Sequence, residues 1–72
     1  MTNTYKLKCR ILKSGLKKKD IAKNMGITYY SLLKKINNDV EFKASEITEL
    51  AKILHIEEFN EKESIFFADN SD

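Results

Sequence analysis

Residues 20–38, DIAKNMGITYYSLLKKINN, place a glycine between two segments that both have helical character. Gly26 is one of only two glycines in the chain. A helix that ends in a sharp turn favours glycine, because glycine adopts positive φ without a Cβ clash. Two helices that cross closely need a small residue in the first helix and an apolar residue after the turn, and Ala22 and Ile27 occupy those places. The stretch therefore predicts two short helices that meet across one turn, over about residues 18–37.

The second helix of this pair, from residue 29 to about residue 37, has two chemically different sides. Leu32 and Ile36 share one side, which must pack against the rest of the molecule. Tyr29 lies at the margin, where its ring can either complete a small core or face outward. Thr28 offers a hydroxyl to the free N–H groups at the helix start. The hydrogen-bonding side chains on or beside the outward side are those of Tyr30, Ser31, Lys34, Asn37 and Asn38.

Further helices are predicted on both sides of the pair. The first begins at Thr4, as its N-cap, and ends at Gly15. Another runs from about residue 44 to residue 55, and a short fifth helix starts at the capping-box string NEKE, residues 60–63. Because proline and polar/apolar alternation are absent, the sequence predicts an all-α bundle of four to five helices. The expected apolar residues are Leu7, Cys9, Ile11, Leu12 and Leu16 in the first helix, Ile21, Ala22 and Met25 in the second, Ile47, Leu50, Ala51 and Leu54 in the fourth, and Ile65, Phe66 and Phe67 in the fifth.

Length and composition exclude several classes of protein. Seventy-two residues make one small domain. No apolar run approaches the ~20 residues that span a bilayer, and no apolar segment follows the first lysines, so we expect neither a membrane span nor a signal peptide, and a cytoplasmic location. Cys9 cannot form an internal disulfide and is expected to pack as a small hydrophobe. His55 has no arguable nucleophile or orienting carboxylate, so we expect no enzyme, cofactor, metal or small-molecule substrate.

Charge is distributed unevenly along the chain. Residues 1–43 contain eleven Lys or Arg against three acids, whereas residues 57–72 contain six acids against one Lys. A basic surface on a small domain indicates a polyanionic partner, most often nucleic acid, and the acidic segment 57–72 indicates solubility or a basic partner. A DNA major groove admits an α-helix, in which Asn37 could pair with adenine and Lys34 could donate to guanine. Lysines at the helix ends would bind phosphates, so affinity would fall steeply with salt.

These residues, followed by EFKASEITELAKILHI at residues 41–56, resemble the helix-turn-helix regulators that include bacteriophage Cro proteins and the N-terminal domains of phage repressors. The resemblance covers about residues 7–67 and implies one lambda-repressor-like domain over residues 1–72, with the third helix in the major groove of a DNA operator. Lys17 and Lys18 stand where the family usually has Ser or Thr and then Gln. Carried over by position, the resemblance assigns base contacts to Thr28, Tyr29, Tyr30, Lys34 and Asn37, and phosphate contacts to Lys17, Lys18, Ser31, Asn38 and Lys43.

The same resemblance implies a transcriptional regulator, encoded by a phage or prophage, that acts as a Cro-like switch between lytic and lysogenic growth in a bacterial host. The alternative is a modulator that binds a CI-type phage repressor and alters its DNA binding. An autoregulating antitoxin ranks third, because we see no toxin-neutralising extension. The apolar residues near the C-terminus have two interpretations that stay open: they either close the core or form a homodimer or partner contact, and they are Phe59, Ile65, Phe66 and Phe67.

Overall fold

Five short helices follow one another through residues 1–68, the part of the chain that the computed structural model describes. No strand occurs among these residues, which confirms the all-α class. The radius of gyration, 11.2 Å, equals the value of about 11 Å expected for a compact domain of this length. The helices are α1 Thr4–Ser14, α2 Lys18–Met25, α3 Tyr29–Ile36, α4 Ala44–Ile53 and α5 Phe59–Phe66.

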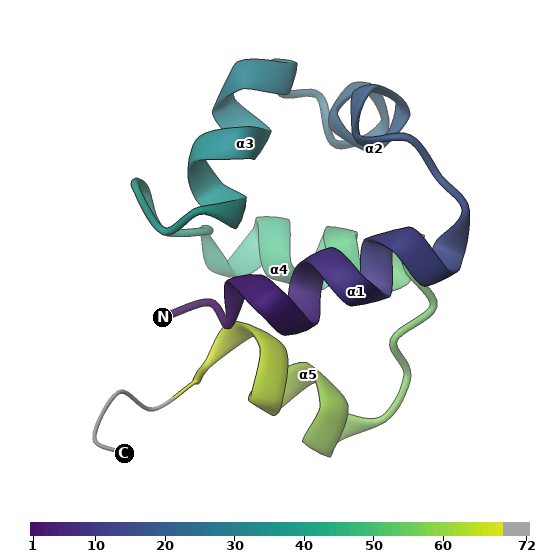
Figure 1. The fold of residues 1–72 in the computed structure, drawn as a ribbon, viewed down its shortest axis with the longest axis vertical. Helices are drawn as coiled ribbons and strands as arrows, with labels where there is room; N and C mark the ends of the chain where they lie inside the picture. Colours follow the sequence, from purple (N-terminus) through teal and green to yellow (C-terminus); the bar gives the residue numbers. More distant parts are fainter. Residues whose placement is uncertain (69–72) are drawn as a thin grey trace.

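The helices surround one hydrophobic core. In Figure 1, α1 and α4 cross the middle of the molecule, with α2 and α3 on one side and α5 on the other. Each helix contributes an apolar stripe, as expected for short amphipathic helices whose stability comes mainly from packing. The largest fully buried side chains are Leu7, Ile21, Leu32, Ile36, Leu50 and Leu54.

The turns form where the sequence predicts them. Gly15 and Gly26 end α1 and α2 with φ of 75° and 72°, the left-handed region that glycine adopts without strain. Asn38 follows α3 with a φ of 66°, in agreement with the predicted stop. His55 follows α4 with a φ of 57°, so α4 ends at Ile53 rather than at His55. A positive φ at a residue with a Cβ is tolerated here because each chain reversal is held by backbone hydrogen bonds.

The start of α1 differs from the prediction. Asn3, not Thr4, is the N-cap, and its side chain accepts a hydrogen bond from the Lys6 N–H at 3.0 Å. The Thr4 hydroxyl is used elsewhere, since it donates to the Ile36 carbonyl at 2.7 Å. Asparagine caps helices as well as serine or threonine does, so either neighbour could serve. The contact with Ile36 decides between them.

The outward face of α1 also corrects the prediction. Leu7 and Ile11 are buried, but Cys9 is exposed and Leu12 is 82% exposed. Because α1 has apolar residues on two sides, sequence periodicity alone did not show which side faces the core. The expectation that Cys9 packs as a core hydrophobe is wrong.

The last helix begins at Phe59, with Glu58 as an N-cap that makes no side-chain cap bond, so the predicted capping box at residues 60–63 is not formed. Ile65 and Phe66 are buried, and the Phe66 ring meets the Phe42 ring edge to face at 5.7 Å. Phe59 and Phe67 are exposed. The C-terminal apolar residues therefore divide, with two in the core and two on the surface.

None of the helices in residues 1–68 combines the length and the apolar character needed to cross a membrane.

Candidate nucleic-acid interface

The turn between α2 and α3 is held by local hydrogen bonds. The Gly26 N–H donates to the carbonyls at the end of α2, and the Ile27 N–H donates to the Ala22 carbonyl at 3.0 Å. The Thr28 hydroxyl accepts from the Ser31 N–H at 3.0 Å and caps α3 as predicted. Ile27 is half-buried against the core. Three residues thus join the two helices. Gly26 makes the turn, Ile27 packs against the core and Thr28 caps α3.

The outward side of α3 carries the side chains predicted to contact bases. Tyr30 is 68% exposed, Asn37 is exposed, and Tyr29 is about half-exposed, so its ring does not complete the core. The Lys34 ammonium lies 5.1 Å from the centre of the Tyr30 ring, a cation–π contact. This contact joins two of the predicted base-reading side chains and limits their freedom. The exposed side of α3 therefore presents a phenol, an ammonium and an amide within one short helix.

A buried ion pair fixes the inward side of α3. The Lys35 ammonium lies 2.5 Å from a Glu46 carboxylate oxygen of α4, and the two side chains are only 8% and 12% exposed. Glu46 also accepts a hydrogen bond from the Lys43 N–H at 2.8 Å. Burial alone would raise the pKa of Glu46, but the Lys35 ammonium and the Lys43 N–H together lower that pKa below its ordinary value. Glu46 therefore keeps its charge and links α3 to the start of α4.

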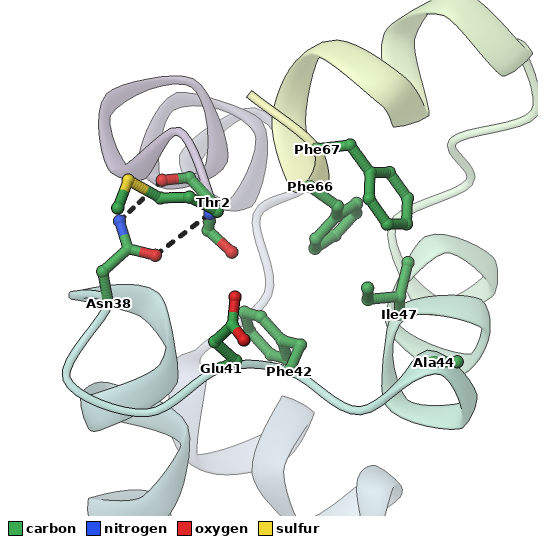
Figure 2. Close-up of a pocket in the computed structure, with 9 residues that line it drawn as sticks. Thr2, Asn38, Glu41, Phe42, Ala44, Ile47, Phe66 and Phe67 are labelled. Atoms are coloured by element: carbon green, nitrogen blue, oxygen red, sulfur yellow. Dashed lines mark hydrogen bonds between the residues drawn. The ribbon is translucent and has the colours of Figure 1, made fainter. Parts of the chain in front are cut away.

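The end of α3 is fastened to the start of the chain. The Asn38 amide donates to the Thr2 carbonyl at 2.6 Å and to the Thr4 hydroxyl, and its oxygen accepts from the Thr2 N–H at 3.0 Å, as Figure 2 shows for the two bonds with Thr2. The Thr4 hydroxyl in turn bonds the Ile36 carbonyl. Both amide hydrogens of Asn38 are used within the molecule, so the predicted phosphate contact of this side chain would compete with these bonds and stays a prediction. Asn38 holds α3 in position.

The predicted phosphate-binding lysines lie at two helix starts. Lys17 is the N-cap of α2 and Lys18 is its first residue, and both line one surface groove with Tyr29. Lys43 precedes α4 and is connected to α3 through Glu46. Ser31 is half-buried on α3, with its N–H occupied by the Thr28 cap. The structure thus brings Lys17, Lys18 and Tyr29 together and places Lys43 at the start of another helix.

Several residues that shape this surface were not singled out from the sequence. Lys35 directly follows Lys34 in sequence, and its charge gives no local signal that it is buried. Lys8 and Lys19 line the same groove as Lys17, together with the exposed Leu12 and Leu16. Leu12 was expected as an apolar residue of the first helix, but the helical period alone did not show that it faces outward. The two N-terminal threonines gave no signal, because their partners are more than thirty residues away.

Comparison of the chain with protein-family models, with curated proteins and with solved structures gave no match.

Proposed function

We propose that this chain is a DNA-binding transcriptional regulator of the helix-turn-helix type, in which α3 enters the major groove of an operator. The observation that carries the proposal is that α3 is fixed by burial on one side and exposed on the other. Leu32, Ile36 and Lys35 are buried on one side, whereas Tyr30 and Asn37 are exposed on the other. A major groove admits a helix whose exposed donors and acceptors meet base edges. A rigid α3 lowers the entropic cost of ordering those groups on DNA.

Charge supports the same assignment. Lys17 and Lys18 at the start of α2 and Lys43 at the start of α4 can each neutralise a phosphate. Three lysines in the first turn of α2 or just before it oppose the helix dipole, which a bound phosphate would relieve. Tyr30 and Lys34 are the proposed base contacts of α3, with Thr28, Tyr29 and Asn37 beside them. By the resemblance described above, we propose a Cro-like role in a phage genetic switch, inside a bacterial host cell.

The test is DNA binding by the purified protein. A gel-shift or anisotropy titration uses the DNA upstream of the protein's own coding region, and a random duplex library if that region fails. We expect Tyr30→Ala and Lys34→Ala to weaken specific binding at least about tenfold, since each good base contact is worth about 1–3 kcal/mol. Lys52→Ala, which removes an exposed lysine from α4, is the matched control and should bind like the wild type. Circular dichroism should show unchanged helix content in all three.

Salt separates the two kinds of contact. Lys17→Ala should weaken binding to every sequence and reduce the slope of log K against log salt by about 0.9, the value for one phosphate. Tyr30→Ala should leave that slope unchanged, because it removes no charge. Absence of any DNA complex at low salt, about 20 mM, would contradict the proposal, since lysine–phosphate contacts are strongest there.

A second function is favoured by one observation: Phe59 and Phe67 are exposed beside acidic residues. Such a surface suits contact with the basic DNA-binding domain of a CI-type repressor, whose operator binding it would alter. α3 also lacks the Arg and Gln side chains that most often read bases. Tight binding of the neighbouring repressor by Tyr30→Ala and Lys34→Ala, with no DNA shift by the wild type at low salt, would support this modulator function instead.

A further inference from the structure

α1 exposes an apolar stripe on the side opposite its buried face. Its members are Tyr5, Cys9 and Leu12, at intervals of four and three residues along one side of the helix, with Leu16 just beyond its end. Tyr5 is 77% exposed and Leu12 is 82% exposed. We call these four residues the α1 stripe. A helix that is apolar on two sides is typical of one that is covered on both, whereas only Leu7 and Ile11 of α1 are covered by the core.

The charges around the α1 stripe restrict what can cover it. α1 contains four basic residues and no acidic one. Lys8 and Lys13 lie on either side of the stripe, and Lys17 and Lys19 line the groove beside Leu12 and Leu16. Two α1 stripes placed face to face would bring these lysines together, which costs free energy. A covering surface should therefore combine apolar and acidic side chains.

The same molecule carries such a surface on α5. Phe59, Glu63 and Phe67 follow one another at four-residue intervals and share a groove with α4. Phe59 is 70% exposed and Phe67 is 52% exposed. We call these three residues the α5 surface, and exposed Glu58 flanks it while Lys62 is its single base. The apolar residues span about 12 Å along α5 and about 10 Å from Tyr5 to Leu12 along α1, so the two rows match in length.

We propose that the α1 stripe of one copy of this chain docks on the α5 surface of a second copy. Phe59 and Phe67 would pack against Leu12 and its neighbours, with Glu58 and Glu63 facing the lysines of α1. The contact is heterologous, because it joins two different surfaces, so each bound copy still offers one free stripe and one free α5 surface. It explains why both apolar rows are exposed. Because Lys17 lines the groove beside Leu12 and Leu16, docking there and the proposed phosphate contact of Lys17 draw on the same groove.

The contact is small, so weak association is expected. A few exposed side chains on each copy place it at the low end of interface sizes, and a Kd on the order of 0.1 mM follows. Salt should weaken it, since lysines and glutamates face one another at its solvent-exposed rim. With one unused surface at each end, the average mass should rise beyond that of a dimer as concentration increases, whereas an isologous dimer would reach a plateau.

Sedimentation equilibrium of the full chain without DNA tests this. We expect concentration-dependent association of the wild type at about 50 mM salt and much less at about 500 mM. Leu12→Asp and Phe59→Lys should each abolish it, and both substitutions replace exposed side chains, so folding is retained. Val40→Asp, at another exposed apolar residue outside both surfaces, is the matched control and should associate like the wild type.

Mixing the two inactive variants provides the decisive measurement. Phe59→Lys keeps an intact α1 stripe and Leu12→Asp keeps an intact α5 surface, so an equimolar mixture should form dimers of one copy of each and nothing larger. Alkylation of Cys9, the only cysteine and a member of the α1 stripe, should slow in the Phe59→Lys partner when it is mixed with Leu12→Asp.

Two results would overturn the proposal. One is a wild type that stays monomeric at low salt up to about 1 mM, ten times the expected Kd. Another is a mixture of the two variants that stays monomeric while the wild type associates, since that indicates an isologous contact. If the wild type is monomeric, a shift of its α1 amide resonances on addition of a synthetic helical peptide of leucines and glutamates would show that the stripe serves another protein instead.

Discussion

The Lys35 ammonium of α3 and the Glu46 carboxylate of α4 form an ion pair inside the bundle, with 2.5 Å between Nζ and Oε2. A buried pair of charges gains little over a well-packed apolar pair, because both ions lose hydration. Its removal on one side is costly, because the other charge then stays buried without a partner. We infer that the pair serves mainly to hold α3 at one position along α4. That position determines which α3 side chains are exposed.

Glu46→Gln should destabilise the protein by about 3 kcal/mol, since Lys35 keeps its burial but loses its counter-charge. The glutamine still accepts a hydrogen bond, so the loss reports mainly on charge. Urea unfolding followed by circular dichroism measures it. The double variant Lys35→Met with Glu46→Gln is the control, and it should recover much of the loss because no unpaired charge remains. A double variant as unstable as Glu46→Gln alone would show that packing, not charge, is responsible.

Acid should remove part of the stability through Glu46. Its pKa in the folded protein lies below the ordinary value of 4.5, so the unfolded chain binds a proton more readily than the folded one. The stabilising contribution is therefore complete above about pH 4.5 and is lost as the pH falls through the lowered pKa of the folded state. Unfolding free energies of the wild type and Glu46→Gln, measured from neutral pH down to about pH 3, should converge on acidification. A constant difference across that range would contradict this assignment.

Asn38 should contribute in two separable ways, through its side-chain hydrogen bonds and through its positive φ of 66°. Asn38→Gly removes the bonds to Thr2 and Thr4, but glycine adopts the positive φ without strain. We expect the free energy of unfolding to fall by about 1–3 kcal/mol. Asn38→Ala removes the same bonds and adds about 1 kcal/mol of left-handed strain. Thermal denaturation of both variants gives the comparison. Equal stability of the two would show that the backbone conformation costs nothing at this position.

The two adjacent phenylalanines at the end of α5 should respond very differently to truncation. Phe66→Ala should cost about 3–5 kcal/mol, because it opens a cavity beside Phe42 and its ring is 3% exposed. Phe67→Ala should cost less than about 1 kcal/mol, since half of its side chain already contacts solvent. Chemical denaturation at micromolar protein, where self-association is negligible, measures both. Similar losses in the two variants would mean that Phe67 belongs to the core.

Local chemistry explains why the α2–α3 segment could be predicted from sequence. Gly26, Thr28 and Leu32 lie within seven consecutive residues and act through a turn, a cap and a helical period. The same logic predicted that Tyr30 is exposed, because an outward side follows once Leu32 and Ile36 are placed inside. Base and phosphate contacts of these residues stay predictions.

Contacts between residues far apart in sequence account for most of what was missed. Nothing near Lys35 shows that it is buried, because its partner Glu46 lies eleven residues away on another helix. Asn38 has the composition of a surface turn residue, yet its amide is used by Thr2 from thirty-six residues earlier. Leu12 was misplaced for a different reason, since α1 is apolar on two sides and a helical period does not say which side the core takes.

The fastening of α3 to the first residues of the chain limits how its proposed DNA specificity can be transplanted. Thr2 and Thr4 bond Asn38 and the Ile36 carbonyl, and the Asn3 N–H donates to the Ile65 carbonyl of α5. A graft of residues 18–38 onto another scaffold would carry the exposed side chains but leave these bonds behind. The angle at which the grafted helix could enter a DNA groove would then be set by the new scaffold. A faithful chimera has to include the opening residues of the chain and the end of α5 that secures them.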